Sequence, residues 1–333
     1  MNKIKYAIEI GGAYTKIYVK DEGFALCEPT LLAAEPTPQG YKIIGLGKQA
    51  KDMLGKTNDS VEVFSPITNG QINNYEYLKQ LLLYYFEQLG FKKKYDSCMV
   101  LINVGLSNRD SDNFLAIMHD IGFKEVILLP TIICSAIGAG KNISSTKTNL
   151  VVNIGGANTD IAVINMNSIV KGATLGIGGR AVDAAIANTI AYKQGIVVGV
   201  SSCEKLKIEV GSLYKNDSLN MEITGVDIDS KIPRSYIISS KDLLEVLEPF
   251  FEEIIRTIDV TITSLPPEIS TDIINNGVLF TGGMSKTNGL ESYLRTHFKY
   301  PFKIVEDAEN VSILGAGKLL DDRELLEKIL ENV

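Results

Sequence analysis

The 333-residue sequence contains no tryptophan, only two histidines and only four cysteines. The histidines, His119 and His297, are too few to support a zinc site or a Ser-His-Asp hydrolase. The cysteines are widely spaced and form no Cys-x-x-Cys pair, so we expect reduced, buried thiols. Any chemistry must therefore come from carboxylates, lysines, backbone amides or a metal that oxygen ligands bind.

The sequence also lacks a long apolar run and an excess of positive charge. No run approaches the length of a membrane span, and a strand pattern that begins near the N-terminus leaves no room for a signal peptide. We therefore expect a cytoplasmic protein. The net charge of -7 and the pI near 5.1 argue against direct nucleic-acid binding. What remains is an ordinary globular composition in a chain long enough for two domains.

A nine-residue sequence motif, here called the repeated phrase, occurs twice. Residues 9–17 read EIGGAYTKI and residues 153–161 read NIGGANTDI, which are identical at six of nine positions. Each copy ends an apolar run, turns at two glycines and enters another β-rich run, which indicates two strands joined by a tight turn. Glycines let backbone N–H groups approach a ligand, and a row of such groups binds anions. Two such turns facing each other would clamp a phosphate chain.

Strands and helices alternate in both halves of the chain. In the first half we expect a helix over 74–89, a strand over 99–104, a helix over 111–121, a strand over 125–129 and a helix from 132. In the second half we expect helices over 181–192 and 202–211, and a long helix for which Ser240 is the N-cap. This order predicts an α/β fold that arose by duplication, with the two halves facing each other across a cleft.

Two Gly-x-Gly-Lys strings, Gly138–Lys141 and Gly315–Lys318, resemble part of a phosphate-binding P-loop. A P-loop also needs a glycine five residues before its Gly-Lys pair. Those positions are occupied by Ser135 and Ser312. We therefore expect the first string to allow close helix packing and the second to pack at the start of a helix near the nucleotide.

The two glycine hairpins and the later turn at Thr281-Gly282-Gly283 resemble the actin, sugar-kinase and heat-shock ATPase superfamily. Further segments, in shared order and spacing over almost the whole chain, are similar to the bacterial actin MreB. They are Cys27–Thr30, Ala50–Thr57, Pro66–Ile72, Ala136–Gly140, Lys205–Ser212 and Leu265–Glu268. The chain is thus identified as a divergent MreB-like actin.

The resemblance implies an actin-like duplicated α/β fold. Each of its two facing domains would contain a central mixed sheet, with a nucleotide cleft between them. Domain I would comprise residues 1–141 and 310–333, with a small subdomain at about 30–72. Domain II would comprise residues 142–309, with a small subdomain at about 185–245.

The resemblance also implies that ATP or ADP binds in the cleft with Mg²⁺. The nucleotide-binding residues would be Gly11, Gly12, Ala13, Lys16, Gly155, Gly156, Ala157, Asn158, Glu204, Lys207, Gly282, Gly283 and Met284. Glu204 and Lys207 lie one helical turn apart and would both reach the nucleoside. Glu9 and Asn153 would reach the metal ion through water.

Several positions depart from the family pattern. The family has aspartate at the positions of Glu9 and Asn153, so Asn153 removes one carboxylate. The acid that positions the attacking water is replaced by Thr131, after Pro130, and Val104-Gly105-Leu106 replaces a Pro-Thr-Gly stretch. Losing a catalytic acid or base typically costs roughly two to four orders of magnitude in rate. Our hypothesis is a protein that binds nucleotide but hydrolyses it slowly or not at all. Two alternatives stay open: the protein binds Mg²⁺ through the nucleotide phosphates alone, or it has lost nucleotide binding.

Filaments that organise cell shape or other cell structures, usually at the membrane, are the function that the resemblance implies. The loop Phe91–Lys94 is basic and aromatic, which makes it a candidate contact with an anionic membrane surface, although a solvated loop is the simpler interpretation. Lys16 is shared with plasmid-partition actins, and the missing acid is compatible with a non-polymerising actin-fold adaptor. Both alternatives stay open, since fold alone does not determine function.

Overall fold

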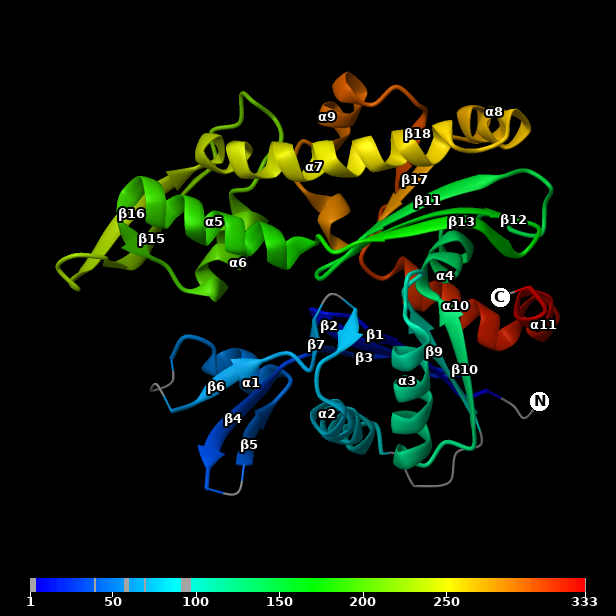
Figure 1. Ribbon diagram of the computed structural model, residues 1–333, viewed down its shortest axis with the longest axis horizontal. Helices are drawn as coiled ribbons and strands as arrows, with labels where there is room; N and C mark the ends of the chain where they lie inside the picture. The colour runs from blue at the N-terminus through cyan, green and yellow to red at the C-terminus, as the bar shows by residue number, and fades with distance from the viewer. Residues whose placement is uncertain (1–3, 39, 57–59, 69, 91–96, 333) are drawn as a thin grey trace.

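Two five-stranded sheets, one in each half of the chain, form the frame of the computed structural model, which describes residues 4–38, 40–56, 60–68, 70–90 and 97–332 (Figure 1). The first sheet contains β1 (Tyr6–Ile10), β2 (Tyr14–Val19), β3 (Gly23–Pro29), β9 (Ser97–Ile102) and β10 (Glu125–Pro130). Its strand order is β10-β9-β1-β2-β3. The hairpin β1-β2 is antiparallel, whereas β1 and β9 are parallel, so the sheet is mixed.

The second sheet repeats this plan. It contains β11 (Asn149–Ile154), β12 (Thr159–Asn165), β13 (Ser168–Leu175), β17 (Val278–Thr281) and β18 (Phe302–Ile304). Its order is β13-β12-β11-β17-β18, with β11-β12 antiparallel and β11-β17 parallel. Each copy of the repeated phrase therefore spans the first hairpin of its own sheet. The predicted duplicated α/β fold with two mixed sheets is confirmed.

Smaller sheets lie beside the two large ones. One contains β4 (Leu32–Thr37), β5 (Gly40–Leu46) and β6 (Glu62–Phe64), next to the short helix α1 (Lys48–Met53), and β7 (Ile67–Thr68) pairs with β8 (Gln71–Ile72). The other contains β14 (Ile196–Val197), β15 (Asn220–Asp227) and β16 (Pro233–Ser239). Figure 1 shows the β4-β5-β6 and β14-β15-β16 sheets at the same end of the molecule, away from the two termini.

Helices cover the outer faces of the large sheets. In the first half these are α2 (Tyr75–Gln88) and α3 (Asn108–Ile121). In the second half they are α7 (Ser240–Thr263), α8 (Pro267–Asn276) and α9 (Leu290–His297), with the 3-10 helix η1 at Gly283–Lys286. The helices α5 (Gly179–Gln194) and α6 (Val200–Glu209) pack against each other and against the small β14-β15-β16 sheet. The N-cap of α7 is Ser239, which forms a capping box with Asp242, so the predicted N-cap at Ser240 is wrong by one residue.

The helices α4 (Thr131–Gly138) and α10 (Val311–Asp321) pack between the two large sheets, and α11 (Arg323–Leu330) follows them near the chain ends (Figure 1). The close approach of α4 and α10 depends on glycine. A Cβ at Gly138 would collide with the carbonyl oxygen of Val311, and one at Gly315 with that of Cys134. The first Gly-x-Gly-Lys string thus serves close helix packing, as predicted. The second also packs against a helix, but it lies inside α10 and not at a helix start.

The environment of the cysteines agrees only partly with expectation. Cys98, Cys134 and Cys203 are buried, but Cys27 is exposed. Cys27 lies on β3, an edge strand of the first sheet, and its neighbour Leu26 occupies the buried face instead. The period-two alternation of an edge strand therefore places Cys27 outward.

Among the helices of the described residues, none combines the length and apolar character that crossing a membrane requires. The candidate membrane loop Phe91–Lys94 lies outside the described residues.

Candidate functional site

The first glycine turn joins β1 to β2 through Gly11, Gly12 and Ala13. The Gly11 N–H donates a hydrogen bond to the carbonyl oxygen of Tyr14 at 3.0 Å. A Cβ at Gly11 would lie only 2.8 Å from that same oxygen. Glycine is needed here because the tight turn brings backbone against backbone.

The second turn has the same geometry. The Gly155 N–H donates to the carbonyl oxygen of Asn158 at 2.9 Å, and a Cβ at Gly155 would lie 3.0 Å from that oxygen. The similarity of sequence in residues 9–17 and 153–161 is thus a similarity of backbone hydrogen bonding.

The two turns touch each other at the interface between the two halves of the protein, which we call the seam. A Cβ at Gly12 would collide with the Ala157 side chain, and one at Gly156 would lie 2.7 Å from the Cβ of Ala13. The contact is reciprocal, because each alanine fits against the glycine of the other turn. Within the described residues, the backbone N–H groups of these four residues donate to no protein acceptor. Four unpaired amides in two facing turns form an anion-binding arrangement.

Glu9 and Lys16 lie beside the first turn. They are directly opposite in the β1-β2 ladder, and Lys16 Nζ lies 3.7 Å from Glu9 Oε2. The Ser312 hydroxyl, at the start of α10, donates to the same carboxylate oxygen at 2.9 Å. Lys16 also donates to the carbonyl of Glu309. A positive charge is therefore fixed next to the unpaired amides, where a phosphate would need it.

Asn153 takes the position of Glu9 in the second hairpin. Its cross-strand partner in the β11-β12 ladder is Asp160, whereas Glu9 has Lys16. A Cβ at Gly282 would lie 2.6 Å from the Asn153 Oδ1 atom, and Gly282 has φ +87°, so the later glycine turn closes directly on this strand end. Within the described residues, no three His, Cys, Asp or Glu side chains cluster as direct metal ligands.

Thr131 is the first residue of α4 and is buried. Its hydroxyl donates to the carbonyl oxygen of Ile102, the last residue of β9, at 3.1 Å. The side chain therefore caps a strand end, and a hydroxyl used in this way is no base for a water molecule.

Glu204 and Lys207 are both on α6, but they have different partners. Lys207 Nζ lies 2.8 Å from Asp183 Oδ1 and donates to the carbonyl of Gly179 at 3.1 Å, which ties α6 to α5. Burial raises the pKa of Asp183, and the Lys207 charge offsets part of that rise. Lys207 also lies beside Met284, since a Cβ at Gly179 would meet Lys207 Nζ at 3.1 Å and Met284 Sδ at 3.3 Å.

Glu204 reaches across the seam to Lys51 on α1. The distance from Lys51 Nζ to Glu204 Oε2 is 3.1 Å, and Lys51 also donates to the Tyr14 hydroxyl at 2.9 Å. Burial lowers the pKa of Lys51, but the hydrogen bonds to Tyr14 and Glu204 outweigh it and the pKa is raised. Sequence reasoning missed Lys51, Tyr14 and Asp183.

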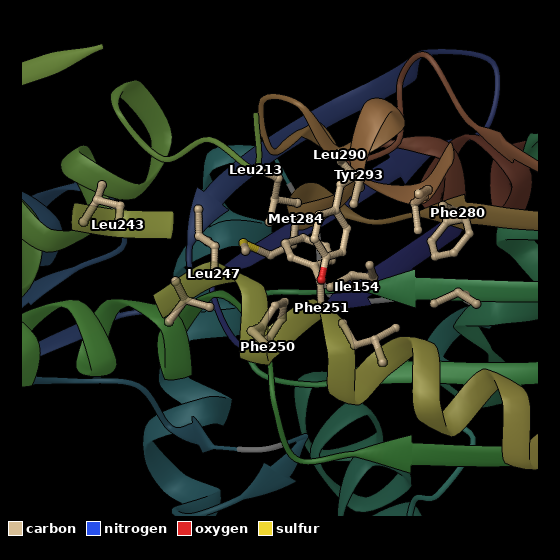
Figure 2. Packing of buried hydrophobic residues seen from close by; sticks show 14 of the residues in the cluster. Ile154, Leu213, Leu243, Leu247, Phe250, Phe251, Phe280, Met284, Leu290 and Tyr293 are labelled. Atoms are coloured by element: carbon tan, nitrogen blue, oxygen red, sulfur yellow. The ribbon is translucent and has the colours of Figure 1, made fainter. Parts of the chain in front are cut away.

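Met284 belongs to the core of the second half. It is buried, and Figure 2 shows its side chain lying with Leu213 and Leu247. Gly283 has open space around a Cβ position. The segment Gly282–Met284 thus presents backbone toward the second turn and inserts its side chain into the core.

Two duplicated halves, each with a glycine hairpin, and turns that meet at the seam define an actin-like, two-domain protein. The chain belongs to the MreB/Mbl family, whose model matches residues 3–328. Its curated relatives include the cell shape-determining protein MreB of Escherichia coli K12, 30% identical over 321 residues, which are 95% of this chain and 92% of that protein. The cell shape-determining protein Mbl of Bacillus subtilis 168 is 30% identical over 325 residues, 96% of this chain and 97% of that protein.

Solved structures agree. MreB5 of Spiroplasma citri bound to AMPPNP superposes with a TM-score of 0.90 and 28% identity, covering 98% of each chain. The same protein bound to ADP gives the same TM-score, over 99% of this chain and 100% of that one. A MamK double helical filament, at 16% identity and a TM-score of 0.77, shares the fold, covering 95% of this chain and 98% of that one.

Proposed function

We propose that this chain binds ATP or ADP at the seam between its halves and assembles with copies of itself into filaments that act in cell shape. The observation that carries the proposal is the pair of touching glycine turns, with the four N–H groups of Gly12, Ala13, Gly156 and Ala157 available for phosphate oxygens. MreB5 of Spiroplasma citri, similar over nearly the whole chain, is solved with AMPPNP and with ADP.

The other proposed nucleotide contacts follow from where each residue lies relative to the two glycine turns. Lys16 would meet the phosphates, and it would do so from its place beside the first turn. Asn158 would add its amide from the second turn. Glu204 and Lys207 would contact the nucleoside, with Gly282, Gly283 and Met284 bordering it. Glu204 would contact the nucleoside while it keeps its ion pair with Lys51.

The residues beside the two glycine turns could hold Mg²⁺ in one way, as a hydrated ion. Mg²⁺ retains several waters and is bound mainly by phosphate oxygens and one or two carboxylates. Glu9 supplies one carboxylate, and Asn153 supplies a neutral oxygen at the equivalent strand end. These two side chains would bind the hydrated ion through water, and the ion would supply charge neutralisation for the phosphates.

We propose that hydrolysis is weak or lost, because Thr131 offers a hydroxyl already bonded to Ile102 where the family resemblance places an acid. The domain division at 1–141 plus 310–333 and 142–309 is part of the same proposal. The two large sheets, and the packing of α10 against α4, support it. A cytoplasmic location with contact to a membrane surface completes it.

Sedimentation of the purified chain with ATP, with ADP and without nucleotide, combined with phosphate release from the same samples, tests the proposal. Nucleotide binding and pelleted filaments with slow phosphate release are expected. Absence of pelleting under all three conditions would favour a non-polymerising adaptor. Phosphate release as fast as that of the Escherichia coli relative, measured in parallel, would overturn the assignment of weak hydrolysis.

A further inference from the structure

Asp160 is a buried carboxylate that the site described above does not use. It lies on β12, two residues after Asn158 of the second turn, and is 1% exposed. Among the described residues, no lysine, arginine or histidine lies within ion-pair distance of it. An isolated carboxylate in the interior is costly, so its retention calls for a role.

The environment of Asp160 comes from both halves of the protein. Thr174, its cross-strand neighbour on β13, donates to Oδ1 at 2.5 Å, and the Asn158 amide donates to Oδ1 at 3.5 Å. The backbone N–H of Val104, in the loop after β9, also bonds to the carboxylate. Both side-chain donors reach Oδ1, and none of the described side chains donates to Oδ2.

The same short loop connects Asp160 to the position of the missing acid. Thr131 donates to the carbonyl of Ile102, and two residues later Val104 donates to Asp160. Gly105 then donates to the Thr174 hydroxyl at 3.0 Å. Thr131, from the first half, and Asp160, from the second, therefore both bond to the backbone of residues 102–104.

The duplication indicates which way Asp160 faces. Asp160 lies five residues after Gly155, as Lys16 lies five residues after Gly11, and the two are paired across their hairpins with Asn153 and Glu9. Lys16 is fixed beside the first turn. By the same geometry, Asp160 is fixed beside the second turn with the opposite charge.

We propose that Asp160 is the catalytic base of the residual nucleotide hydrolysis, and that it positions the attacking water from the second half of the protein. The inference rests on the proposed nucleotide site. Asp160 accepts a proton from a water whose oxygen attacks the terminal phosphorus of the nucleotide. The bond from that phosphorus to the bridging oxygen breaks, nucleoside diphosphate leaves, and the proton passes from Asp160 to the released phosphate.

Single-turnover phosphate release from the full chain with Mg-ATP tests the proposal, with AMPPNP affinity measured separately. Asp160→Asn preserves size and should lose about tenfold or more of the rate while AMPPNP affinity changes less than about threefold. Asp160→Glu should restore part of the rate. Undiminished release from Asp160→Asn overturns the proposal, and so does a wild-type chain that binds AMPPNP but releases no phosphate. Failure of the wild type to bind AMPPNP instead refutes the proposed nucleotide site.

Discussion

Lys51 on α1 and Glu204 on α6 form an ion pair of 3.1 Å that joins the small β4-β5-β6 sheet of the first half to the second half. Both side chains are about one-third exposed or less, so the pair is only partly screened by solvent. Tyr14, from the first hairpin, is the third partner, because its hydroxyl accepts a hydrogen bond from Lys51. The pair thus links both halves at the proposed nucleoside contact.

Lys51→Met should therefore speed release of bound nucleotide. A partly exposed pair contributes at most about 1 kcal/mol, which corresponds to about a fivefold faster dissociation. Stopped-flow release of a fluorescent ADP analogue measures this, and high salt should reduce the difference between variant and wild type. Lys48→Met, at an exposed lysine of the same helix, is the matched control and should release ADP at the wild-type rate. Equal rates in all three proteins would show that the pair does not restrain the ligand.

The contact between the glycine turns predicts that Gly12→Ala is damaging. The added methyl would collide with Ala157, and overpacking costs typically about 1–3 kcal/mol. A lower melting temperature and weaker AMPPNP binding are expected, while Gly176→Ala, which has open space for a Cβ, should behave like wild type. Adding Ala157→Gly to Gly12→Ala should recover much of the loss. A double variant no better than the single one would argue against direct contact between the turns.

Thr131→Glu should increase phosphate release. The substitution restores a carboxylate at the N-terminus of α4, where a negative charge is also favourable to the helix. An increase of about tenfold or more is expected, below the full range of about 10²–10⁴ because the hydroxyl contact to Ile102 is lost. Thr131→Gln has nearly the same shape without the charge, and it should show no increase. If the glutamine variant accelerates release equally, the effect is steric and the acid is not what the chain lacks.

The sequence was sufficient for the local parts of the fold and site. Strand, Gly-Gly and strand predicted both hairpins, and the repetition predicted two sheets of the same plan. The partners of Glu204 and Lys207 could not be predicted, because their contacts with Lys51 and Asp183 join distant segments. Such pairs depend on how distant segments of the chain pack together in the folded protein.

Asp160 could have been found from the sequence. It is the one carboxylate in the apolar run of β12, TDIAVIN, and the repeated phrase aligns it with Lys16. A charged residue within a strand buried on both faces is unusual and often functional. Its hydrogen bonds to Val104 and Thr174, however, depend on how the loop after β9 meets the second half.

Asp160 also makes a prediction about stability. Its pKa of about 6 in the folded protein lies above the ordinary value of 3.8, because burial disfavours the charged form. Between about pH 4 and pH 6 the folded state therefore binds more protons than the unfolded state, and stability falls as the pH rises. At neutral pH the ionised carboxylate costs up to about 3 kcal/mol, at about 1.4 kcal/mol per unit of pKa.

Asp160→Asn removes this cost and should be more stable than wild type at pH 7.5, by about 1–3 kcal/mol, with a difference that shrinks toward pH 4.5. Urea unfolding followed by far-UV circular dichroism measures it, since the chain has no tryptophan for fluorescence. Asp183→Asn is the contrasting control: it should destabilise, because it leaves the Lys207 charge without its partner at 2.8 Å. A gain in stability together with a loss of phosphate release is the signature of a residue retained for function. If Asp160→Asn is instead less stable at pH 7.5, the carboxylate stabilises the junction between the halves, and its burial needs no catalytic explanation.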